Sequence, residues 1–273
     1  MSHLKLYYSR CRAFYYYYYI CFVTFKISII MSAFSNIASN IFMPIDDAFG
    51  IYNREIVHEL LVNIQNDFAL SLEKSVDMST LCMIEYRPGD PQCNKIPNGH
   101  LIFLSTQGDE WWRWAYQFSH EYCHSLINGA STGEISGLIW FEETMCHLAS
   151  IYQLKNLIEF CSMSPDYLLN SYKEVACHCL MANFGQPQYN CREYLLSVAD
   201  QLAEPDYHRE IYSNLSATMS SLFLENKHLW KIILHFGDMR KWNSLHELFE
   251  HLQSKASQDY AHTLQKLYNL LFS

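Results

Sequence analysis

Apolar residues recur at intervals of three and four along much of the chain, which is the spacing of an amphipathic helix. This pattern predicts helices over residues 47–74, 109–128 and 138–160. The apolar stripe of the first helix consists of Ile56, Val57, Leu60, Leu61, Ile64 and Phe68. The second helix is crowded with aromatic residues, which at this spacing are more typical of a core than of a cofactor site.

Short apolar runs at residues 81–86 and 100–105 are typical of strands. A segment rich in proline and glycine separates them and is expected to be a loop. Residues 79–106 are therefore expected to form a small sheet or hairpin. The next helix follows directly, and Asp109 is a suitable residue to cap it.

The chain after residue 160 is expected to be helical. Ser164-Pro165-Asp166 is typical of a helix start, with Ser164 as the cap, and Gly185-Gln186-Pro187 is typical of a break. Further helices are expected from Asn190, after residues 204–206, and over residues 230–236, 244–253 and 258–272. The fold class is therefore mainly α with a small β element (α+β).

The N-terminal segment, residues 1–42, shows no pattern that matches the rest. Basic residues precede an apolar run over 14–30 that contains five consecutive tyrosines and is interrupted by Lys26. The run resembles a signal peptide or membrane anchor, but it is short, and tyrosine prefers the membrane interface. A disordered tail and a native start at Met31 or Met43 are the alternatives, and we slightly favour the later start. We therefore expect the fold to begin near Met43.

Composition narrows the classes of function. The chain has 273 residues, of which 50% are hydrophobic and 17% charged, so it can bury a large core. The net charge is −9 and no basic run alternates with aromatic residues, so nucleic acid is not an expected partner. The ten cysteines follow no disulfide framework, which indicates reduced thiols in a cytoplasmic protein. The oligomeric state does not follow from the sequence.

The motif with the clearest chemical meaning is His120-Glu121-Tyr122-Cys123-His124, which reads H-E-x-x-H. Residues four apart share one face of a helix, so both imidazoles can reach the same ion. Zinc accepts nitrogen and oxygen ligands, and a catalytic zinc keeps one position for water. A glutamate next to the first histidine can accept a proton from that water.

A second motif, Trp140-Phe141-Glu142-Glu143, follows at the start of the next expected helix. Eighteen residues separate His124 from Glu143. Over residues 99–150 the chain resembles the gluzincins, the zinc peptidases that include thermolysin and the zinc aminopeptidases. Their pattern is H-E-x-x-H followed, after about eighteen residues, by a glutamate ligand that often lies in a Trp-x-x-Glu sequence.

The resemblance implies one Zn²⁺ per chain, with His120, His124 and Glu143 as its ligands and Glu121 as the general base. It implies a metallopeptidase that hydrolyses peptide bonds with a zinc-bound water, acting on a peptide or protein. It also implies a zincin-like core over residues 43–160, with the helical region 161–273 packed on it. In this group, a sheet edge beside the site often pairs with extended substrate.

The chain departs from the family pattern at two positions. Thr144 stands where the aminopeptidases usually have glycine, and His147 stands where thermolysin-like enzymes have an aspartate. The carboxylate that should orient a ligand histidine is therefore unassigned. His147 is expected to be such a partner, part of the cleft wall, or simply packed.

Two further alternatives remain open at this point. Glu142 could replace Glu143 as the ligand, but neighbours on a helix point about 100° apart, so only one can face the metal, and the spacing favours Glu143. The function could also be that of a catalytically silent interaction or regulatory protein on the same scaffold, or of a membrane-anchored assembly factor. The many later tyrosines and histidines do not reveal which residue would stabilise an oxyanion.

Overall fold

The computed structural model describes residues 34–273 apart from 39, 45–46, 75–78, 128–136 and 205. The described part contains one sheet and a larger set of helices, so the mainly α fold with a small β element is confirmed. The Tyr-rich run at 14–30 lies outside the described residues. None of the helices in the described part is long and apolar enough to cross a membrane.

The sheet has five strands, with β3 at its centre. In spatial order they are β1 (Phe34–Ala38), β2 (Ile41–Pro44), β3 (Leu81–Tyr86), β5 (Gly99–Leu104) and β4 (Gln92–Ile96). The three inner strands are parallel to one another, and each edge strand is antiparallel to its neighbour. Gly99 lies so close to the Leu81 backbone that a β-carbon would collide with it, so this pairing requires glycine.

The predicted strands at 81–86 and 100–105 are confirmed nearly to the residue, but they are not a hairpin. They pair in parallel because the loop expected between them contains a strand, β4, that supplies the antiparallel return. The sequence of β4 is short and mostly polar, so it lacks the alternation of apolar residues that predicts a strand. The boundary near Met43 also needs correction, because residues 34–38 (β1) and 41–42 (in β2) belong to the sheet and Ile41 is fully buried.

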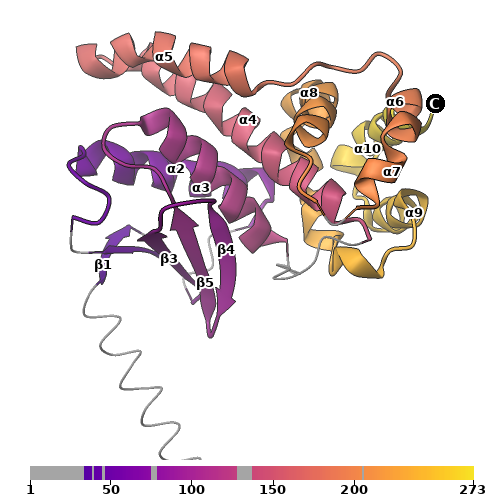
Figure 1. Ribbon diagram of the computed structural model, residues 1–273, viewed down its shortest axis with the longest axis horizontal. Coiled ribbons are helices and arrows are strands. Elements are labelled where there is room, and N and C mark those ends of the chain that lie inside the picture. Colours follow the sequence, from indigo (N-terminus) through magenta and orange to yellow (C-terminus); the bar gives the residue numbers. More distant parts are fainter. Residues whose placement is uncertain (1–33, 39, 45–46, 75–78, 128–136, 205) are drawn as a thin grey trace, which may run out of the picture.

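Two helices, α2 (Arg54–Ser71) and α3 (Trp111–Leu126), lie over one face of the sheet (Figure 1). The first was expected from residue 47 but begins after Asn53, whose side chain accepts a hydrogen bond from the Ile56 N–H. Asp109 does not cap α3 as expected; its carboxylate accepts from the Asn53 N–H. Helix α3 ends at Leu126. Its expected end at residue 128 lies outside the described residues.

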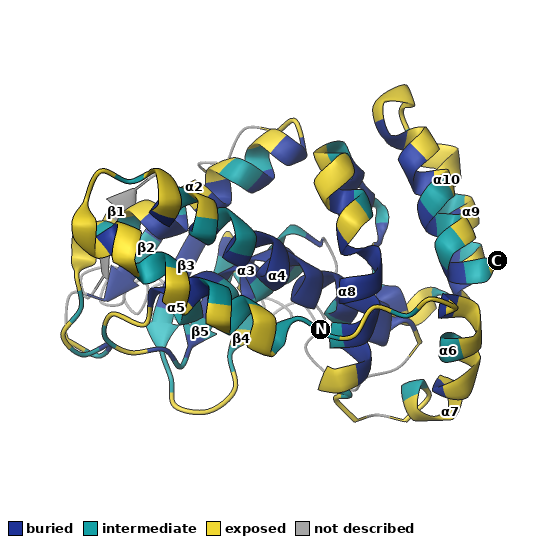
Figure 2. Cartoon of the chain, turned by 90° about the horizontal axis from the view of Figure 1, so that it is seen from above, coloured by how far each residue is buried: buried dark blue, intermediate teal, exposed yellow. Residues whose placement is uncertain are grey.

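Helix α4 (Ile139–Met163) is the longest of the described helices and carries buried residues on all sides. Such a helix is stable only when it is surrounded by protein. It packs on α3, α5 and α8, and Figure 2 shows it buried where these neighbours meet it. The helix therefore joins the part of the molecule that contains the sheet to the helical remainder.

The remaining elements are helical, as predicted. They are α5 (Tyr167–Asn183), α6 (Cys191–Ser197), α7 (Ala199–Leu202), α8 (Arg209–Glu225), the 3₁₀ helices η1 (Lys227–His235) and η2 (Met239–Lys241), α9 (Leu245–Lys255) and α10 (Gln258–Phe272). Asn190 and Ser244 cap α6 and α9 with their side chains. At the start of α5, however, Asp166 is the cap and not Ser164.

The place of β1 and of Ile41 in the sheet gives a first prediction. A chain that begins at Met43 loses β1 and the buried Ile41 side chain. We expect its free energy of unfolding to fall by about 2–5 kcal/mol, the cost of deleting one large buried aliphatic side chain, with lost strand pairing in addition. Urea unfolding followed by circular dichroism measures this. A chain that begins at Met31 is the control, and equal midpoints for the two chains would contradict the prediction.

Candidate metal centre

One face of α3 lines a cleft of about 580 Å³. Trp112, Tyr116, His120 and His124 follow each other at intervals of four residues, so they share this face. The opposite side of the helix is apolar and packs into the core through residues such as Trp114 and Phe118, both fully buried. Core packing thus fixes the rotation of α3 and turns both motif histidines toward the cleft.

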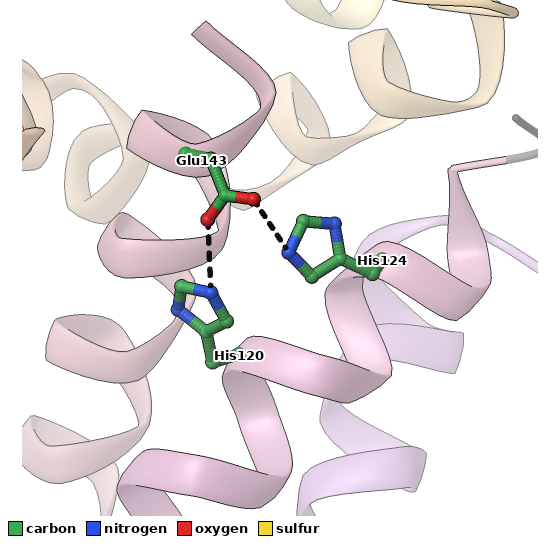
Figure 3. Close-up of side chains that lie close together, drawn as sticks. All are labelled: His120, His124 and Glu143. Carbon is green, nitrogen blue, oxygen red and sulfur yellow. Dashed lines mark ion pairs between the residues drawn. The ribbon is translucent and has the colours of Figure 1, made fainter. Parts of the chain in front are cut away.

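Glu143, in the first turns of α4, faces the two histidines (Figure 3). Its Oε2 lies 3.3 Å from His120 Nε2, and its Oε1 lies 3.5 Å from His124 Nε2. The side chains of these three residues are 13–16% exposed. The structure therefore brings together the three residues that the sequence named as ligands.

The spacing of these atoms suits a zinc ion. Zinc bonds of about 2.0–2.1 Å in a tetrahedral arrangement place neighbouring ligand atoms about 3.3 Å apart. Each nitrogen–oxygen distance is close to this value, with one Glu143 oxygen facing each histidine, and one donor atom from each residue can be chosen so that all lie within 4.8 Å of one another. Two imidazoles and one carboxylate, partly open to a cleft, are also the donor set of a catalytic zinc site.

Glu142 has a different role from that of its neighbour. Its Oε1 lies 2.8 Å from His124 Nδ1, and the side chain is fully buried. The bond makes Nδ1 the protonated nitrogen of His124 and leaves Nε2 free to bind a metal. Glu142 is thus the orienting carboxylate that the sequence left unassigned. The two glutamates contact His124 at opposite ring nitrogens, which their divergent directions on α4 allow.

The expected base, Glu121, lies on the wall of the same cleft. It is only 5% exposed, and it accepts a hydrogen bond from the Cys93 N–H of β4. Burial raises the pKa of Glu121, although the two neighbouring histidines act in the opposite direction. A carboxylate with a raised pKa holds a proton more strongly than an exposed one, which suits a general base.

Charge within the cluster favours a cation between the histidines and Glu143. Burial disfavours protonation of His124, but the carboxylates of Glu143 and Glu142 outweigh this effect and raise its pKa well above the usual value. Burial would raise the pKa of Glu143, yet the two histidines hold that pKa far below its usual range. The site therefore attracts positive charge, and protons and a metal ion would compete for it.

His147, for which the sequence left three possibilities, is packed in the core beside the cleft. The ring is 1% exposed, accepts from the Tyr116 hydroxyl at Nδ1 (2.9 Å) and donates from Nε2 to the Asn183 carbonyl (3.3 Å). Burial, with a smaller contribution from His120, lowers the pKa of His147 to about 3. His147 touches none of the three candidate ligands through these bonds, so it supports the wall rather than the metal site.

The cleft is closed on its other side by residues that the sequence did not single out. Tyr207 and Arg209, at the start of α8, line it together with Asn183 at the end of α5. Burial around the Tyr207 hydroxyl and the negative charge of Glu143 raise the pKa of Tyr207. Tyr207 is therefore protonated at neutral pH and can donate a hydrogen bond into the site. Nothing in the local sequence distinguishes it from the other tyrosines.

The strand at 100–105 is not the sheet edge beside the site. β5 has partners on both sides, whereas β4 has one partner among the described strands. Residues 90–93, at the start of β4, line the cleft. The exposed edge near the candidate metal site is therefore that of β4.

A second group of acidic residues and a histidine, at Glu73, His228 and Asp259, is not a comparable site. Lys231 Nζ lies 2.7 Å from Glu73 and 2.5 Å from Asp259, so an ammonium group already occupies the space between the carboxylates. This ion pair ties η1 to α10 and to the end of α2.

Comparison with known proteins adds no assignment. A scan against protein-family models found no matching family, and a search among curated proteins found no similar sequence. The candidate metal site therefore depends on the spacing of the motif and on the geometry of its residues.

The geometry predicts about one zinc per chain in protein purified without added metal. His120→Ala and His124→Ala should each remove it, because two ligands do not complete a zinc shell. Glu142→Ala should weaken zinc binding about 10- to 100-fold, as is typical for a residue that orients a ligand. Elemental analysis and titration against a competing chelator measure both effects.

Two matched variants serve as controls for this prediction. Glu142→Gln keeps an acceptor for His124 Nδ1 and should lose much less affinity than Glu142→Ala. His147→Gln removes a neighbouring buried histidine and should keep the metal, provided that the variant folds. Zinc retention in both His120→Ala and His124→Ala would show that the ligands lie elsewhere.

Proposed function

We propose that this protein is a zinc-dependent peptidase of the gluzincin type. The observation that supports the proposal is the convergence of His120 and His124 from α3 with Glu143 from α4, at 3.3 and 3.5 Å, beside the buried Glu121. A zinc ion with one open position and a carboxylate base in the same cleft can together hydrolyse an amide bond.

Zinc, when bound, would act as a Lewis acid toward the scissile carbonyl and would increase the acidity of a water molecule. Glu121 would accept a proton from that water and pass it to the leaving amine. Its hydrogen bond from the Cys93 N–H fixes the carboxylate toward the β4 side of the cleft. Glu142 would keep His124 in the tautomer that presents Nε2.

Tyr207 is the residue that we assign to stabilisation of the developing oxyanion. It lines the cleft, its hydroxyl is protonated at neutral pH, and the charge of Glu143 acts on it. A hydroxyl donor that is already in place when negative charge develops on the carbonyl oxygen lowers the barrier.

The substrate in this proposal is a peptide in extended conformation. On its outer side β4 pairs with no other described strand, and a strand added there would lie along the cleft that Glu121 also lines. Backbone hydrogen bonds to such an edge give affinity with little dependence on side chains. The choice of cleavage site would then depend on other residues of the cleft.

The proposal predicts that Glu121→Gln keeps zinc and fold but loses hydrolysis, because an amide cannot accept the proton. The loss should be at least about 100-fold. Cleavage of a degenerate hexapeptide pool, followed by mass spectrometry, measures the loss over many sequences at once. No cleavage by the zinc-loaded wild-type protein would overturn the proposal and favour a catalytically silent scaffold.

A separate prediction concerns Tyr207→Phe. This change removes one hydroxyl and should lower kcat by about 100-fold, with little change in KM or zinc content, because the bond forms mainly in the transition state. Tyr189→Phe, at a fully exposed tyrosine outside the cleft, is the matched control. An unchanged kcat in Tyr207→Phe would remove Tyr207 from the mechanism.

A further inference from the structure

Arg209 is a cation in the cleft that lacks a carboxylate partner among the described residues. Arg54, Arg113 and Arg240 each form an ion pair with a nearby acidic side chain. Arg209 instead contacts neutral groups, although it lines the same cleft as the acidic candidate site. Arg209 is exposed where it lines the cleft, and a guanidinium without a carboxylate partner at this position is suited to bind an anionic group of a ligand.

Neutral acceptors hold the guanidinium in place from one side. Arg209 Nη2 donates to Asn183 Oδ1 at 3.0 Å and to the Tyr116 hydroxyl at 3.4 Å. Asn183 is itself fixed, because its Nδ2 donates to the Cys179 carbonyl and its own carbonyl accepts from Ser213. Within the described part of the chain, these bonds engage only Nη2, which carries two of the five N–H donors of the group. The rest of the planar fork is available for a carboxylate.

The position of Arg209 determines how far a ligand group bound to it would lie from the scissile bond. Tyr116 lies four residues before His120, which is about 6 Å along α3. Tyr207, which we assign to the oxyanion, lies two residues before Arg209 and lines the same cleft as Glu143. One residue of an extended peptide spans about 3.4 Å. A group bound by Arg209 would therefore belong to a residue one or two positions from the scissile bond.

We infer that Arg209 selects substrates with a carboxylate one or two residues from the cleaved bond. This inference rests on the proposed peptidase function. The carboxylate is either the C-terminus of the peptide or an Asp or Glu side chain. Asp90, Glu121 and Glu143 also line the cleft and would repel a carboxylate placed near them. Attraction at Arg209 and repulsion elsewhere would together fix the register of the peptide.

Binding to a protein that cannot turn over tests the selection separately from catalysis. The zinc-loaded Glu121→Gln protein is titrated with acetyl-tetra-alanine as the free acid and as the C-terminal amide. It is then titrated with the amidated peptides acetyl-Ala-Ala-Glu-Ala and acetyl-Ala-Ala-Gln-Ala. We expect at least one acidic peptide to bind about 10- to 100-fold more tightly than its neutral counterpart, as for a hydrogen bond to a charged group.

The added Arg209→Gln change should abolish this preference while zinc content and circular dichroism stay unchanged. Arg209→Lys keeps the charge without the fork and should retain a weaker preference. Arg192→Gln removes an exposed arginine outside the cleft and is the control for net charge. A preference within the first peptide pair would show that Arg209 binds the C-terminal carboxylate. A preference within the second pair would show that it binds an acidic side chain.

Three outcomes would overturn the inference: equal binding of acidic and neutral peptides, a preference that survives Arg209→Gln, or no binding of any acidic peptide. Hydrolysis of the same peptides by the wild-type protein is followed in parallel. Absence of hydrolysis with an intact Arg209-dependent preference would overturn the proposed function alone. Hydrolysis without the preference would overturn the role of Arg209 alone.

Discussion

The contact between α3 and α4 is the interaction on which the candidate site depends. The histidines come from one helix and the glutamates from the other, so a small rotation of either would separate them. Small side chains let the two helices approach closely: the Ser150 hydroxyl donates to the Tyr116 carbonyl at 2.8 Å, and the buried thiols of Cys123 and Cys146 interact. Because α4 is buried on all sides, its rotation is fixed by the whole core.

The parts of the structure that follow from local patterns could be predicted from the sequence. Periodic apolar residues gave the helices, and the H-E-x-x-H spacing with the later Glu143 gave three residues that do meet in space. The expected start of α2 was seven residues too early, because the turn before Asn53 continues the apolar pattern without being helical. Strand β4 was missed because an exposed edge strand needs no apolar alternation.

The roles that depend on contacts between distant segments could not be predicted. From the sequence Glu142 is a rival candidate ligand, and only its bond to His124 indicates that it would orient a ligand instead. Arg209 and Asn183 lie far from the motif along the chain, and they reach the cleft because α5 and α8 both pack on α4. The departure at His147 has a packing explanation, since its ring bridges Tyr116 and Asn183 behind the cleft wall.

The course of α4 has a consequence for how the molecule would respond to metal. Its first turns carry Glu142 and Glu143, and the rest of the helix is a shared core for α5 and α8. An ion that binds only the folded chain stabilises it by about 4 kcal/mol when its concentration is 1,000 times the dissociation constant. Through α4 this thermodynamic linkage would extend to helices that hold no ligand. A change that loosens the C-terminal half would then weaken metal affinity. Conversely, removal of the metal would lower the protection of backbone amides in the C-terminal half against hydrogen exchange.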